Sequence, residues 1–82
     1  MSTSSPTIPA ETARHVLWHW GQPGGCQPGS FTQSLMTTIE RADRVHAEKL
    51  RIIYPDYVAA LKDGDLGIVT QLQAIANGEA AA

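Results

Sequence analysis

The stretch PGSFTQSLMTTIERADRVHAEKLRIIYPDY, from Pro28 to Tyr57, decides the fold of this 82-residue chain. Apolar residues recur in it every three or four positions, a spacing that places them on one face of a helix. The stripe consists of Phe31, Leu35, Ile39, Ala42, His46, Leu50, Ile53, Tyr57 and Leu61. The flanking apolar clusters are shorter, so we expect them to pack on this segment. The residues we expect to be buried are Leu35, Ile39, Leu50, Ile53 and Leu61.

Local signals predict where helices begin and end within this stretch. Ser30 is a suitable N-cap, and Gln33 three residues later would complete a capping box, so a helix is predicted to start at Phe31. Asp43 can act as a second N-cap, which leaves open whether Phe31 to Ile53 is one helix or two helices broken near Asp43. Pro55 cannot continue a regular helix but suits the first position of a new one.

Shorter helical patterns lie on both sides of the stretch. Residues 10–20 read as a helix that starts after Pro9 and stops at Gly21, a residue that tolerates the left-handed conformation. After the helix that Pro55 begins, Asp65 is predicted to cap a last helix, which stops at Asn77-Gly78. No strand-like alternation occurs. The sequence therefore predicts an all-α fold, a small bundle of four or five short helices around a central helical segment.

The length of the chain allows one domain. We expect disordered tails at residues 1–8 and 79–82 and a single helical domain at residues 9–78. A domain of this size buries only roughly 60% of its unfolded surface. Cys26 is the one cysteine, so no intrachain disulfide can stabilise the domain. We expect self-association as a two-fold homodimer to supply part of the missing stability.

Charge and hydropathy restrict the classes of partner. The net charge is -2, and acidic residues such as Glu40, Asp43 and Glu48 interleave with the basic ones. Nucleic-acid binding is therefore not expected, and a small helix-turn-helix-like DNA-binding regulator remains an alternative. The sequence has no run of 18 apolar residues and no positively charged N-terminal segment followed by an apolar one. We expect no membrane partner and a cytoplasmic location.

The histidines and the cysteine raise two kinds of chemistry. His15 and His19 have metal-ligand spacing, and with Cys26 and His46 they form a weak candidate zinc site. No second cysteine or fixed carboxylate supports that site, so we expect no metal or cofactor, and a zinc-stabilised helical domain is kept as an alternative. A catalytic thiol needs a positioned base and an orienting third group, which the sequence does not provide. We therefore expect no enzyme activity.

Two tryptophans indicate a binding surface. Trp18 and Trp20 point roughly 160° apart on a helix. Trp20 continues the apolar face of its helix and is predicted to point inward, which leaves Trp18 toward solvent. Tryptophan is enriched among interface hot spots. The predicted partner-binding residues are Trp18, His15, His19 and Gln22.

A set of short motifs carries a resemblance. They are Trp20-Gly21, Pro28-Gly29-Ser30-Phe31, Ala42-Asp43 and Tyr54-Pro55. Their order over residues 18–61 resembles that in short accessory proteins of actinobacteria and of the phages that infect them. The resemblance brings no catalytic residue with it. It implies a non-enzymatic protein–protein interaction module, a phage-encoded effector that binds and modulates a bacterial host protein.

Overall fold

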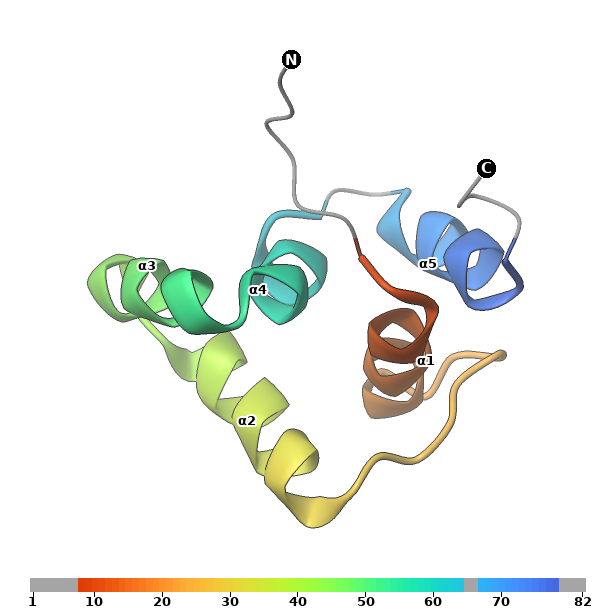
Figure 1. Cartoon of the computed structure of the whole chain (residues 1–82), viewed down its shortest axis with the longest axis horizontal. Helices are drawn as coiled ribbons and strands as arrows, with labels where there is room; N and C mark the ends of the chain where they lie inside the picture. The colour runs from red at the N-terminus through yellow and green to blue at the C-terminus, as the bar shows by residue number, and fades with distance from the viewer. Residues whose placement is uncertain (1–7, 65–66, 79–82) are drawn as a thin grey trace.

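Five helices follow one another in the computed structural model, which describes residues 8–64 and 67–78 (Figure 1). They are α1 (Ala10–His19), α2 (Ser30–Arg41), α3 (Arg44–Ile53), α4 (Pro55–Lys62) and α5 (Ile68–Ala76). The described residues include no strand, and the prediction of an all-α bundle is confirmed. Among these residues, no helix has the length and apolar character needed to cross a membrane.

Helix α1 ends at a glycine in the left-handed conformation, Gly21, as the sequence predicts. Gly21 has φ 67°, and its N–H donates to the Trp18 carbonyl over 3.0 Å, while the next N–H, of Gln22, donates to Leu17 over 2.9 Å. This pair of bonds is a Schellman motif, which satisfies the last carbonyls of the helix. Trp20 is the C-cap rather than the last helical residue.

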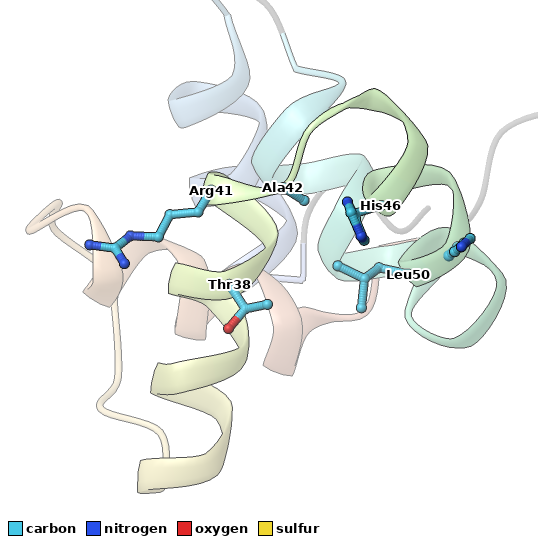
Figure 2. Close-up of a pocket in the computed structure, with 6 residues that line it drawn as sticks. Thr38, Arg41, Ala42, His46 and Leu50 are labelled. Atoms are coloured by element: carbon cyan, nitrogen blue, oxygen red, sulfur yellow. The ribbon is translucent and has the colours of Figure 1, made fainter.

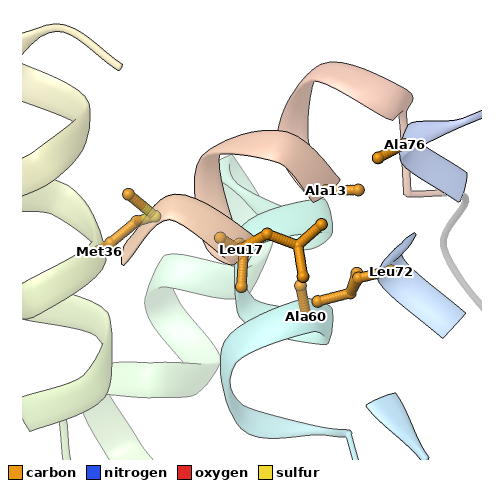
Figure 3. Close-up of a cluster of buried hydrophobic side chains, with 7 residues drawn as sticks. Ala13, Leu17, Met36, Ala60, Leu72 and Ala76 are labelled. Atoms are coloured by element: carbon orange, nitrogen blue, oxygen red, sulfur yellow. The ribbon is translucent and has the colours of Figure 1, made fainter. Parts of the chain in front are cut away.

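The larger of two buried clusters gathers around α1. Helix α1 contributes Ala13, Val16 and Leu17, and single residues or pairs come from α2, α4 and α5: Met36, Ala60, Leu72 and Ala76. Figure 3 shows Met36 reaching from α2 toward Leu17, with Leu72 and Ala76 of α5 on the other side of α1. Ile8, just before α1, also packs against this cluster.

The smaller cluster lies between α2 and α4. Leu35, Ile39 and Val58 are buried there, so the predictions for Leu35 and Ile39 are confirmed. Leu50 and Leu61 are only partly buried against it. The prediction for Ile53 is wrong, since 68% of this residue is exposed.

The error at Ile53 has a backbone cause. Ala42 adopts an extended conformation with ψ 138°, which ends α2 and breaks the helical phase of the stripe. Asp43 then caps α3, and its side chain accepts from the His46 N–H over 2.8 Å. The segment is therefore two helices, and Ala47 is the one buried residue of α3.

The other predicted boundaries can be compared directly with the helices. The capping box does not form: Gly29 is the N-cap of α2, Ser30 is already helical, and Gln33 Nε2 donates instead to the Pro28 carbonyl over 2.8 Å. Pro55 occupies the first position of α4, as predicted. Asp65, the predicted cap of the last helix, lies outside the described residues. That helix ends before Gly78, whose φ is 82°.

Candidate functional site

His15, one of the predicted partner-binding residues, lies in the α1–α4 interface. Its Nδ1 is 2.7 Å from the Tyr57 hydroxyl oxygen, and the two rings stack with their centroids 6.3 Å apart. Beside them, the buried Thr12 hydroxyl donates to the Asp56 carboxylate over 2.5 Å. Burial raises the pKa of the Tyr57 hydroxyl, and the negative charge of Asp56 acts in the same direction. These side chains join two helices of the bundle.

His19 joins α1 to α2. Its Nε2 is 2.8 Å from one carboxylate oxygen of Glu40, and Trp20 Nε1 donates to the other oxygen over 2.9 Å. Burial by itself raises the pKa of Glu40, but the hydrogen bonds from Trp20 and His19 outweigh it, so this pKa lies below its ordinary value. Trp20 is partly buried against the larger cluster, in the inward position that the helical pattern predicts.

Trp18 and Gln22, the other two predicted residues, stay on the surface. Trp18 is 36% exposed. The loop at residues 22–29 passes close behind it, because a Cβ on Gly25 would lie 2.3 Å from the Trp18 backbone nitrogen. Further along, Gln73 Nε2 donates to the Pro23 carbonyl over 3.1 Å, which ties the loop to α5. The loop is thus fixed against the helix, and Trp18 remains partly exposed.

The weak zinc candidates are not brought together. His15 and His19 face different helices, and Cys26 is exposed on the loop, where its backbone N–H donates to Arg14 over 3.1 Å. His46 is on α3, with its Nδ1 2.8 Å from Asp43. Within residues 8–64 and 67–78, no three His, Cys, Asp or Glu side chains are grouped closely enough to hold a metal ion.

A groove that the sequence analysis did not anticipate lies in the corner between α2 and α3. Its volume is about 430 Å³, and its walls are mainly apolar. The lining residues are Thr38, Arg41 and Ala42 from the end of α2 and its junction, and His46, Lys49 and Leu50 from α3. In Figure 2, Thr38 on α2 and Leu50 on α3 point toward each other across this groove.

Large apolar side chains are exposed around the groove. Phe31 is 66% exposed and lies seven residues before Thr38, hence on the same face of α2 two turns away. Ile53 follows Leu50 by three residues, which puts it beside the groove on α3. Val45 and Ile52, which are 62% and 83% exposed, share a face of α3 with Lys49 at i, i+4 and i+7 spacing. In Figure 1, α2 and α3 lie on the left of the molecule, and α1 and α5 lie on the right.

The basic side chains at this corner are not neutralised. Among the described residues, Arg41, Arg44 and Lys49 have no carboxylate within ion-pair distance. The acids that alternate with them in sequence have other partners, one of which, His46, itself lines the groove. Glu40 binds His19 and Trp20, Asp43 binds His46, and Glu48 shares Arg51 with Asp63.

The mixed charge of residues 40–51 is therefore partly separated in space. Arg41 and Lys49 line the groove, with the guanidinium end of Arg41 extending away from Leu50 in Figure 2, while Glu40 pairs with His19 and Glu48 pairs with Arg51. The sequence contained one signal for this arrangement, the option of a cap at Asp43. A cap at Asp43 implies two helices that meet at an angle, and the groove lies on the inner side of that angle.

No family model, curated protein or solved structure matches this chain. The functional argument accordingly starts from the groove and its surroundings.

Proposed function

We propose that this chain is a small non-enzymatic protein–protein interaction module that contacts its partner through the α2–α3 corner. The observation that carries the proposal is the concentration of exposed apolar side chains there. Among the described residues, four of the five large exposed hydrophobic side chains lie on α2 and α3: Phe31, Val45, Ile52 and Ile53. Exposed apolar groups beside a groove are typical of surfaces that a protein partner covers.

The small number of buried residues on α3 supports the same proposal. Helix α3 buries only Ala47, whereas α1 buries Thr12, Ala13, Val16 and Leu17. The apolar residues of α3 therefore contribute little to the core. Their burial in a complex would supply stabilisation that the isolated domain lacks.

The polar side chains of the described residues support a non-enzymatic role. Several acids, histidines and hydroxyls form hydrogen-bonded pairs that join one helix to another. These pairs are Thr12–Asp56, His15–Tyr57 and His19–Glu40. The groove itself is lined by basic and apolar side chains without a carboxylate. The histidine among them, His46, has its Nδ1 2.8 Å from the Asp43 carboxylate, which also accepts from the His46 backbone N–H and so serves as the cap of α3.

Quantitative capture with matched variants tests the proposal. The immobilised chain is exposed to a bacterial lysate, because residues 18–61 resemble proteins of actinobacteria and their phages. Wild type is compared with the double variant Phe31→Gln/Ile53→Gln and with Trp18→Gln. All three are first checked for equal melting temperature. We expect specific proteins to be retained by wild type and by Trp18→Gln and to be lost from the double variant.

Two outcomes contradict this expectation. Equal capture by wild type and the double variant would show that the α2–α3 corner is not the contact surface. Loss of capture with Trp18→Gln alone would move the surface to Trp18, His15, His19 and Gln22.

A further inference from the structure

We infer that the α2–α3 groove binds an acidic, amphipathic helical segment of its partner protein, with apolar side chains on the groove floor and carboxylates on its rim. This inference rests on the proposed function and specifies the chemistry of the partner. It follows from the combination of an apolar floor and unneutralised basic rims.

The floor provides apolar contact. Leu50 is partly buried, Ala42 lies at the junction of the two helices, and the methyl group of Thr38 faces the same space. Phe31 and Ile53 add exposed apolar side chains beyond the groove, and the polar side chains of Ser34 and Thr37 lie between Phe31 and Thr38 on α2. Along α2, from Phe31 to Ala42, the surface is about 16 Å long. That length matches about three turns of a docked helix, whose contacts recur at i, i+3 or i+4, and i+7.

The rims provide the charge. Arg41 from α2 and Lys49 from α3 both line the groove, and the long Arg41 side chain extends outward past α2, with its guanidinium on the side away from Leu50 in Figure 2. Neither has an acidic partner among the described residues. Lys62, another base near this corner, is occupied, since its Nζ donates to the Ala42 carbonyl over 2.9 Å. A segment that carries carboxylates beside its apolar residues would complement Arg41 and Lys49.

A second copy of the chain does not fit this description. In a two-fold dimer the same patch meets itself, so the basic residues of one copy would meet the same basic residues of the other across the interface. The acids nearest to the groove, Glu40, Asp43 and Glu48, already have partners within the chain. Like charges across an interface oppose association.

Nucleic acid fits less well than an acidic protein segment. Phosphate binding depends on clustered basic residues along a surface. Here two unpaired bases flank a floor that is apolar, and the whole chain has a net charge of -2. Arg44, the third unpaired base of this region, is exposed at the start of α3 and does not line the groove.

Three synthetic peptides test the inference by fluorescence anisotropy. The first is an amphipathic peptide of about four helical turns with Leu at i, i+4 and i+7 and Glu on both flanks. The second has Lys in place of each Glu, and the third keeps the Glu residues but has Ser in place of each Leu. We expect the acidic amphipathic peptide to bind at least about tenfold more tightly than either control, with an affinity that falls as salt is added.

Charge-reversal variants locate the binding. We expect Arg41→Glu and Lys49→Glu each to weaken binding of the acidic peptide by about fivefold or more. Arg44→Glu is the matched control, because it makes the same charge change on α3 outside the groove. It should leave the affinity within about twofold. Thermal melts of each variant verify that the fold is kept.

Several results would overturn the inference. Equal binding of the acidic and basic peptides, no binding of the acidic one, or an equal effect of Arg44→Glu and Lys49→Glu would each do so. A single-stranded oligonucleotide that displaces the peptide would indicate nucleic acid, and dimerisation lost in Lys49→Glu would indicate a second copy. If lysate capture still depends on Phe31 and Ile53 while the acidic peptide does not bind, this inference fails and the proposed function stands. If capture is also absent, both fail.

Discussion

Gly25 shows how one residue positions the loop beside α1. Its Cα approaches the backbone of Trp18 so closely that a methyl group has no space, because the nearest atoms belong to the main chain and cannot rotate away. We expect Gly25→Ala to displace the loop and to cost about 1–3 kcal/mol of unfolding free energy, measured by urea denaturation.

The control for this substitution is Gly29→Ala. Gly29 has φ -68°, and no atom lies within 4 Å of an added Cβ. It should cost no more than about 1 kcal/mol, the scale of an N-cap change. Equal costs at the two glycines would show that the close approach at Gly25 is not what holds the loop.

Glu40 makes the stability of the domain depend on pH. Its pKa is lowered in the folded state, so the charged form is favoured there over the unfolded chain. The stabilisation is complete above the ordinary value of 4.5 and is lost as the pH falls through the lower folded value. We expect the unfolding free energy of wild type to exceed that of Glu40→Gln by less than about 1 kcal/mol at neutral pH. The difference is small because the carboxylate is partly exposed and solvent screens its charge.

Urea denaturation of both proteins between neutral pH and about pH 3 measures this difference. The unfolding free energies of the two proteins, plotted against pH, should converge at the acidic end. There the Glu40 carboxyl is protonated and neutral, as the amide of the variant is at every pH. If the difference in unfolding free energy stays constant with pH, the packing and hydrogen bonds of the side chain, rather than the charge of the carboxylate, account for it.

At the scale of the helices, α3 depends on its cap. Asp43 accepts from both the backbone and the ring of His46, and the hydrogen bond from the backbone N–H contributes most to the lowered pKa of Asp43. We expect Asp43→Ala to speed hydrogen exchange of the α3 amides by a factor on the order of five. Ser30→Ala is the control, because Ser30 makes no cap bond in α2. A similar increase in α2 exchange in Ser30→Ala would contradict the assigned caps.

Leu17 and Leu50 both lie on the apolar face of their helix, but they differ in how deeply they are buried. Leu17 is fully buried between helices, whereas Leu50 is partly exposed at the groove. We expect Leu17→Ala to cost about 2–5 kcal/mol and Leu50→Ala about 1–2 kcal/mol, both from urea denaturation. Equal costs would contradict the placement of Leu50 at the edge of the core.

Helical periodicity and capping signals in the sequence predicted most helix boundaries. They could not predict the exposure of Ile53 or the groove, because both depend on how the helices are arranged in space. The stops at Gly21 and Gly78 and the start at Pro55 follow from local backbone preferences, which act within a few residues. The exposure of Ile53 does not, because it depends on the phase that α3 takes after Ala42. The groove was missed for the same reason. Its basic rim depends on which partner each acid finds across the bundle, as Glu40 does at His19 and Trp20.

At the scale of the whole molecule, the two buried clusters are coupled. Tyr57 and Leu61 on α4 pack against both of them. We therefore expect one cooperative unfolding transition, in which far-UV circular dichroism and tryptophan fluorescence give the same midpoint in urea. Both tryptophans report on α1, while circular dichroism reports on all helices. A circular-dichroism transition that precedes the fluorescence change would show that α2 and α3 unfold separately.

The single buried residue of α3 has a consequence for how such a protein can change over time. Substitutions at Val45, Lys49, Ile52 or Ile53 remove little from the core, so we expect them to cost little unfolding free energy. The residues of the proposed contact surface could therefore diverge while α1, α4 and α5 keep the fold. Relatives with the same bundle but a different α3 would be expected to recognise different targets, and selection could act on recognition independently of folding.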